Sequence, residues 1–137
     1  MKCPKTLLAA VVFAACCGCT SVHSAKTFNN VLVDGARTPM ETVEIENSGW
    51  LVFNCLPIAS GNPERPGRNS CRWFRNTVTL DNNMTVLRAH MAESGVDEVA
   101  NLTSHFTDES YLVFLLKRRA CHTSAVLLAP EQTEERK

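Results

Sequence analysis

Residues 80–95, which read LDNNMTVLRAHMAESG, decide the predicted fold. Every third or fourth residue along this stretch is apolar, a spacing that gathers side chains on one face of an α-helix. The members of this apolar stripe are Leu80, Met84, Leu87 and Met91. Asp81 is a residue type that caps helix N-termini, and Gly95 is a type that ends helices in the left-handed conformation. We therefore predict an amphipathic helix over residues 81–94, with Arg88 on its exposed side.

The chain before this helix predicts strands. Polar and apolar side chains alternate over residues 42–46, which is typical of a half-buried strand. Residues 50–53 form a continuous apolar run. Between them, residues 47–49 predict either a tight turn or a bulge within one long strand. Pro57 is expected to end this region because it has no N–H to donate to a sheet.

The chain after the helix predicts further strands. Residues 100–106 alternate, residues 108–110 are typical of a turn, and residues 111–116 are an apolar run suited to a central strand. The basic residues 117–119 are expected to interrupt the pattern before another strand or a continuation over residues 120–129. One amphipathic helix packed on one face of a small, mainly antiparallel sheet is an α+β architecture, and this is the fold class that we predict.

Residues 58–76 contain two glycines and two prolines and predict a long loop. This loop also holds a basic patch with interleaved aromatic side chains: Arg65, Arg68, Arg72, Trp73, Phe74 and Arg75. Such a patch could bind anionic lipid headgroups or an acidic envelope protein. The alternative, which we expect, is that Trp73 and Phe74 pin the loop to the core while the arginines remain solvated.

The N-terminus predicts export. Lys2 and Lys5 precede an apolar run over residues 6–15, which is the order found in secretory signal peptides. Ten apolar residues are fewer than the roughly 20 that a helix needs to cross a bilayer. The sequence therefore predicts a signal segment rather than a permanent membrane span.

The end of this run carries a second signal. Residues 13–16 read Phe-Ala-Ala-Cys, and small residues before a cysteine resemble the lipobox of bacterial lipoproteins. The resemblance implies cleavage before Cys16 and attachment of lipid to its sulfur. Cys19, which follows Gly18, is the alternative site. An ordinary signal peptide cut after a small residue is the other interpretation.

These observations predict four segments: a lipoprotein signal peptide over residues 1–15, a lipidated N-terminus and flexible tether over residues 16–40, a small α+β domain over residues 41–129, and a charged tail over residues 130–137. Within the tether, residues 30–33 could instead add an edge strand. The formal net charge of the chain is zero, and removal of Lys2 and Lys5 with the signal lowers it to −2. This balance excludes the strongly basic surface of a nucleic-acid-binding protein.

Three cysteines fall in the predicted domain: Cys55, Cys71 and Cys121. Disulfides persist in an export compartment, and a bridge between Cys55 and Cys71 would close the long loop. In the entropy model a closed loop of about 15 residues stabilises a fold by ~3 kcal/mol. We predict this bridge, with Cys121 reduced. Pairings that use Cys121, and three thiols, remain alternatives.

No pattern of residues indicates catalysis. Cys121 and His122 are adjacent in a predicted strand, so their side chains point to opposite faces and make a poor nucleophile–base pair. His90, His105 and His122 lack the short spacing that is typical of metal ligands. We therefore predict no metal site, no cofactor and no catalytic residue.

Residues 44–62 read EIENSGWLVFNCLPIASGN. Together with the helix over residues 84–94 and the Gly-Val-Asp sequence of residues 95–97, this segment resembles the TRL-like group of short bacterial lipoproteins. The resemblance extends over residues 42–106. It implies an envelope location and a fold type, and it assigns no activity.

We therefore expect a membrane-anchored lipoprotein of the cell envelope that faces the periplasm or the exterior. Its expected role is that of a non-enzymatic binding or structural module, with the membrane as one partner and an envelope protein or anionic lipid as another. The alternative is a thiol-based redox or hydrolytic enzyme that uses Cys55, Cys71 or Cys121, which an exposed thiol of low pKa would favour.

Overall fold

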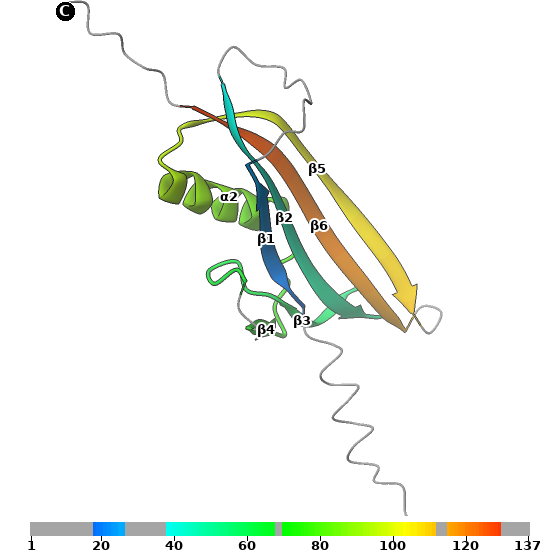
Figure 1. The fold of residues 1–137 in the computed structure, drawn as a ribbon. Coiled ribbons are helices and arrows are strands. Elements are labelled where there is room, and N and C mark those ends of the chain that lie inside the picture. Colours follow the sequence, from blue (N-terminus) through cyan, green and yellow to red (C-terminus); the bar gives the residue numbers. More distant parts are fainter. Residues whose placement is uncertain (1–17, 27–37, 68–69, 112–114, 130–137) are drawn as a thin grey trace, which may run out of the picture.

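The computed structural model describes residues 18–26, 38–67, 70–111 and 115–129. In these ranges six strands form one sheet of order β4-β3-β2-β6-β5, and β1 also pairs with β2. All pairings are antiparallel, and α2 packs on one face of the sheet (Figure 1). The elements are β1 (Thr20–Ala25), β2 (Pro39–Val52), β3 (Leu56–Gly61), β4 (Cys71–Trp73), α2 (Leu80–Ser94), β5 (Glu98–Tyr111) and β6 (Leu116–Leu128). The α+β prediction of one helix on an antiparallel sheet is confirmed, but the sheet is larger than expected.

The first described strand lies within the segment expected to be a flexible tether over residues 16–40. β1 pairs with residues 42–47 of β2, and β3 then pairs with residues 49–52 along the same edge of β2. The tether prediction is therefore wrong for residues 20–25. Thr20 and Val22 face the helix side of the sheet, where Thr20 bonds Asn47 and Val22 packs against the core. The proposed edge strand at residues 30–33 lies outside the described residues.

β2 runs without a break through residues 47–49, so the interpretation as one long strand is correct and the turn is wrong. The irregularity falls just afterwards, where the register with β3 shifts between Trp50 and Leu51. Gly49 lies where neighbouring side chains come very close, since a Cβ there would lie 2.9 Å from the Ser60 Cβ. Glycine is thus needed in this strand for close packing rather than for a turn.

Residues 58–76 were expected to be one long loop, and this is wrong at both ends. β3 extends to Gly61, and β4 pairs with residues 59–61. Pro57 lies inside β3 and not at its end. Pro57 pairs with Leu51 next to the register shift between β2 and β3, and such an irregularity is one of the places where a sheet tolerates proline.

β5 and β6 form a long antiparallel pair, and three sequence expectations about them are wrong. Residues 108–110 belong to β5, and residues 117–119 belong to β6. The run over residues 111–116 is not one strand, because Tyr111 ends β5 and Leu116 begins β6; residues 112–114 lie outside the described residues. The charged residues stay in the strands because opposite charges pair across them: Lys117 and Arg119 bind Asp108, and Arg118 binds Glu46.

α2 matches the predicted helix closely. Gly95 has the left-handed conformation of a C-cap, with φ of 68°, as predicted. The N-cap, however, is Thr79, whose side chain accepts from the Asn82 N–H at 3.3 Å. Asp81 lies in the first turn instead, where its charge favours the helix dipole.

The helix buries a face shifted slightly from the predicted stripe. The buried side chains are Asn83, Val86 and Leu87, with Met84 and Met91 partly buried against the core. Leu80 is 43% exposed and Arg88 is exposed. The sheet completes this core with Val43, Ile45, Ala125 and Leu127. The opposite face of the sheet carries mostly polar side chains.

Candidate functional site

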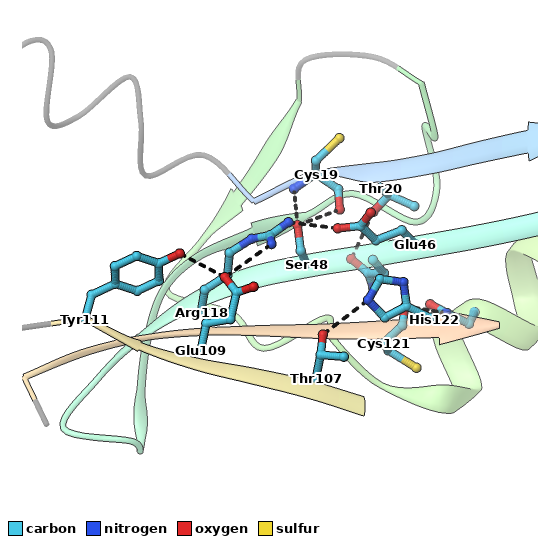
Figure 2. Close-up of polar contacts among 12 residues, drawn as sticks. Cys19, Thr20, Glu46, Ser48, Thr107, Glu109, Tyr111, Arg118, Cys121 and His122 are labelled. Atoms are coloured by element: carbon cyan, nitrogen blue, oxygen red, sulfur yellow. Dashed lines mark hydrogen bonds and ion pairs between the residues drawn. The ribbon is translucent and has the colours of Figure 1, made fainter. Parts of the chain in front are cut away.

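The described chain enters the sheet at Gly18 and Cys19. Gly18 is buried, and a Cβ there would come within 2.3 Å of the Ser48 carbonyl oxygen and 2.5 Å of the Ser60 Cα. Cys19 is tied to β2 through its backbone: its carbonyl accepts from the Ser48 N–H at 2.7 Å, and its N–H donates to Ser48 Oγ at 3.3 Å. The Cys19 side chain is exposed and points away from Ser48 (Figure 2). The sheet therefore holds the chain at residues 18 and 19.

Cys16, the predicted lipidation site, lies outside the described residues. Only Cys17 lies between Cys16 and Gly18, so the Cα atoms of Cys16 and Gly18 are at most about 7 Å apart. A lipid on Cys16 would thus attach close to the place where Gly18, just before β1, lies against Ser60 of β3.

The basic loop lies next to this point. Arg72 contacts Glu64 and donates to Asn62 Oδ1 at 3.3 Å, while Arg65 and Arg75 are exposed. Arg68 lies outside the described residues. A hollow of about 290 Å³ is lined by Glu64, Arg72, Arg75, Asn76, Thr77 and Asn82. The structure therefore brings Arg72 and Arg75 of the predicted patch to one hollow, with Glu64 offsetting part of their charge.

The expectation that Trp73 and Phe74 both pin the loop to the core is wrong for Phe74. Trp73 is 40% exposed, and Phe74 is 79% exposed. Phe74, which follows the last residue of β4, also has a left-handed backbone, with φ of 54°. This exposure favours the other interpretation of the patch, a surface that meets another molecule.

A network of ion pairs and hydrogen bonds lies on the face of the sheet opposite α2 (Figure 2). Arg118 on β6 binds Glu46 of β2 at 2.8 Å and lies 3.7 Å from Glu109 of β5. Glu109 accepts from the Tyr111 hydroxyl at 2.8 Å, and this bond raises the pKa of Tyr111. The Tyr111 ring packs on Trp50 with a centroid distance of 5.2 Å. This network connects β2, β5 and β6 and fixes the orientation of Tyr111 at the end of β5.

The structure confirms that Cys121 and His122 point to opposite faces of β6. His122 stacks on His105 with ring centroids 4.9 Å apart. His122 Nε2 also lies 3.2 Å from the Thr107 hydroxyl (Figure 2). Cys121 is fully buried on the helix side. Burial raises the pKa of the Cys121 thiol, and a hydrogen bond with Thr123 opposes this effect only in part. The thiol is therefore protonated at neutral pH and is a weak nucleophile.

The predicted disulfide between Cys55 and Cys71 is wrong for this structure. None of the described cysteines is disulfide-bonded. Cys71 pairs with Gly61, whereas Cys55 precedes the first residue of β3. Six residues of strand separate Cys55 from Gly61, about 20 Å at 3.3 Å per residue. A disulfide needs Cα atoms within roughly 7 Å, so β3 holds the two cysteines too far apart.

A buried carboxylate lies at the other end of β2. Glu41 is 6% exposed, and its Oε1 lies 3.5 Å from His90 Nε2 on α2. A hydrogen bond from Ser24 lowers the pKa of Glu41; burial opposes this shift, and His90 adds to it. This trio connects β1, β2 and α2, so it fastens the helix to the sheet. Across the ranges that the structure describes, no three histidine, cysteine or acidic side chains are grouped as metal ligands would be.

Six exposed apolar residues gather where β2 meets β3, at the end of β4, and where β5 meets β6; we call them the apolar rim. They are Phe53, Leu56, Trp73, Phe74, Tyr111 and Leu115. Of these residues, the sequence analysis placed Trp73 and Phe74 in the predicted surface patch. The others read as core or strand residues, because the apolar pattern does not show where a strand ends.

In the described part of the chain, no helix combines the length and the apolar character needed to cross a bilayer. Comparisons with protein-family models, with curated proteins and with solved structures found no match to this chain. The chain's own geometry is therefore the basis of the functional argument.

Proposed function

We propose that this chain is a membrane-anchored lipoprotein of the cell envelope that acts as a non-enzymatic binding or structural module. The observation that carries the proposal is the burial of Gly18 in the sheet, close behind the lipobox-like sequence. Gly18 is buried in the sheet only two residues after Cys16, and the lipobox-like sequence ends at that cysteine. A lipid at this position would fix the domain directly at a membrane surface.

The packing of Gly18 favours Cys16 over Cys19 as the lipidated residue. Cleavage before Cys19 would remove Gly18, whose backbone fills the narrow space between Ser48 and Ser60. Cleavage before Cys16 keeps this contact in the mature protein. A lipid on Cys16 therefore leaves the start of β1 intact.

The strength of such an anchor follows from the acyl chains. Each buried methylene contributes about 0.8 kcal/mol, and stable attachment takes two chains or a chain with a second signal. The thiol chemistry of the alternative enzyme lacks comparable support. Cys121 is buried with a raised pKa, and β3 separates Cys55 from Cys71.

Mass spectrometry of the mature N-terminus tests the proposal. We expect a peptide that begins at Cys16 and carries a diacylglycerol on sulfur. Cys16→Ser should abolish the modification and release the protein from membranes, whereas the matched variant Cys19→Ser should retain both. An unmodified N-terminus at Ser21 or beyond would refute the anchor, and lipid on Cys19 would refute only the site.

A further inference from the structure

The apolar rim lies at the same end of the sheet as the start of β1. The turn between β2 and β3 reaches the β5–β6 pair, since the Phe53 N–H donates to the Leu115 carbonyl at 3.0 Å. Tyr111, which pairs with Leu116, lies beside Leu115 and packs on Trp50. Figure 1 shows the start of β1, β3, β4, the end of β5 and the start of β6 all at the lower end of the molecule, with the end of β6 at the opposite pole.

Two phenylalanines of the apolar rim combine high exposure with an unfavourable backbone conformation. Phe53 is 54% exposed and Phe74 is 79% exposed. Both have left-handed backbones, with φ of 50° and 54°, a conformation that asparagine and glycine adopt at lower cost. More than half of the surface of each residue is therefore left in contact with solvent. Outliers of this kind are often associated with functional surfaces.

The short distance from Cys16 to the apolar rim determines what can lie against the rim. Gly18 contacts the backbone of Ser60 on β3, and Ser60 pairs with Arg72 on β4. Adjacent strands are about 4.8 Å apart, so Trp73 and Phe74 lie roughly 10 Å from Gly18. Because Cys16 is at most about 7 Å from Gly18, a lipid on its sulfur brings the bilayer to the rim.

The chemistry of the rim suits the headgroup region of a bilayer. Tryptophan, tyrosine and phenylalanine favour the membrane interface, where an apolar ring and a polar edge are both accommodated. Arg65 and Arg75 are exposed in the loop beside the rim. Basic side chains near a surface are attracted to anionic lipid. The rim and the loop therefore present both features that an anionic bilayer surface attracts.

We propose that the apolar rim is a membrane-docking surface that inserts into the headgroup region of the bilayer to which the N-terminal lipid anchors the chain. This inference rests on the proposed function for its anchor. It adds that the domain lies in a fixed orientation, with the β2–β3 turn, β4 and the β5–β6 end against the lipid and the end of β6 away from it.

Depth-dependent fluorescence quenching tests the orientation. The chain has two tryptophans, so Trp50→Phe leaves Trp73 as the only one. The full chain is produced in bacteria, extracted in detergent and reconstituted into phosphatidylcholine vesicles with a minority of phosphatidylglycerol. With brominated acyl chains we expect a blue-shifted Trp73 emission and about a twofold loss of intensity, because interfacial aromatic rings contact the upper acyl chains. Emission unchanged by the brominated lipid would overturn the proposal.

Met40 supplies the matched control at the opposite end of β2. It is apolar and 44% exposed, which resembles Trp73. A chain with Trp50→Phe, Trp73→Phe and Met40→Trp should show no quenching, and quenching equal to that of Trp73 would overturn a fixed orientation. Phe74→Asn should reduce Trp73 quenching, whereas Met40→Gln should not. Unchanged thermal midpoints would show that both variants fold.

The same samples separate this proposal from the anchor. Mass spectrometry of the N-terminal peptide reports lipidation, and Trp73 quenching reports docking. A lipidated protein without quenching overturns docking and leaves the anchor. Quenching in a protein without lipid supports docking and overturns the anchor.

Discussion

The side-chain amide of Asn83 on α2 donates to the carbonyl oxygen of Cys121 on β6 at 3.0 Å. The same nitrogen lies 3.0 Å from Thr123 Oγ1 and 3.4 Å from the carbonyl of Ile45 on β2. Asn83 is completely buried. A single polar side chain thus connects the helix to two strands and fixes where the helix lies on the sheet.

Replacement of Asn83 should lower the free energy of unfolding, and the size of the loss should depend on the charge of the new side chain. Asn83→Ala removes the amide that donates to the Cys121 carbonyl and to Thr123 Oγ1, and at about 0.5–1.5 kcal/mol for each hydrogen bond the loss should be about 1–3 kcal/mol. Asn83→Asp places a carboxylate against carbonyl oxygens and should cost more at pH 7, with part of the loss recovered in acid as the carboxylate is protonated. Urea unfolding of both variants measures this. Glu93→Gln, at an exposed position of the same helix, is the control. Equal stability of all three variants would contradict the role of Asn83.

Leu87 and Arg88 are adjacent on α2 and differ in burial. Leu87 is 3% exposed within the core, and Arg88 is exposed. Leu87→Ala should lower the free energy of unfolding by about 2–5 kcal/mol, as large-to-small core changes do. Arg88→Ala should change it by less than about 0.5 kcal/mol. Similar shifts in the two melting midpoints would show that the buried face of α2 is misassigned.

Cysteine reactivity should separate the thiols by burial. Cys55 is exposed and Cys121 is fully buried with a raised pKa. In the native protein an alkylating reagent should modify Cys55 within minutes and leave Cys121 unmodified until denaturant is added. Peptide mapping after native and denaturing labelling measures the difference. If Cys55 reacted only after reduction, it would be part of a disulfide, and the strand register that separates it from Cys71 would be wrong.

Asp108 should contribute a small, pH-dependent stabilisation. The hydrogen bond from Arg119 and the contact with Lys117 lower its pKa from 3.8 to about 2. Because the folded-state pKa is the lower one, the stabilisation is present above about pH 4 and is lost as the pH falls toward 2. The side chain is 36% exposed, so solvent screening limits the effect to less than about 1 kcal/mol.

The Asp108→Asn variant tests this dependence. It should be slightly less stable than the unaltered chain at pH 7 and equally stable near the folded-state pKa of about 2. Urea titrations at the two pH values measure the difference. A deficit of the same size at both pH values would show that the charge of Asp108 is not its cause.

The left-handed phenylalanines should be dispensable for folding. Phe74→Asn keeps a residue type that tolerates positive φ and removes a ring that is 79% exposed. We expect unchanged stability or a gain of up to about 1 kcal/mol, since the left-handed conformation costs roughly 1–2 kcal/mol for most residues. Calorimetry of Phe53→Asn and Phe74→Asn measures it. A large loss of stability would mean that the rings serve the domain itself rather than an outside surface.

Much of α2 could be predicted because its determinants are local. The spacing of Met84, Leu87 and Met91 reflects helical geometry, and Gly95 ends the helix through its own backbone freedom. The α+β class followed from this helix and the alternating strands around it. The boundaries were less reliable: Thr79 rather than Asp81 caps the helix, because both side chains can cap and only geometry chooses between them.

The candidate site was harder to predict because exposure is not a local property. The residue types of Trp73 and Phe74 suit a core or an interface equally, and the pairing of β4 with the end of β3 leaves them outside. Phe53, Leu56 and Leu115 read as strand residues because nothing in their spacing marks the end of a sheet. Gly18 carried no sequence signal for burial, because its contact partners are 30 and 42 residues away along the chain.

The sequence by itself determined the helix and the strand-rich remainder, since each depends on residues within a few positions of one another; export remains a prediction from the N-terminal pattern. Only the tertiary structure decided that residues 20–25 form a strand, that residues 108–110 and 117–119 continue their strands, and that Cys55 and Cys71 lie apart. The physical reason is that strand pairing is a long-range interaction. A charged residue such as Asp108 continues a strand when an opposite charge, here Arg119, lies across from it in the neighbouring strand, and interrupts the strand when none does.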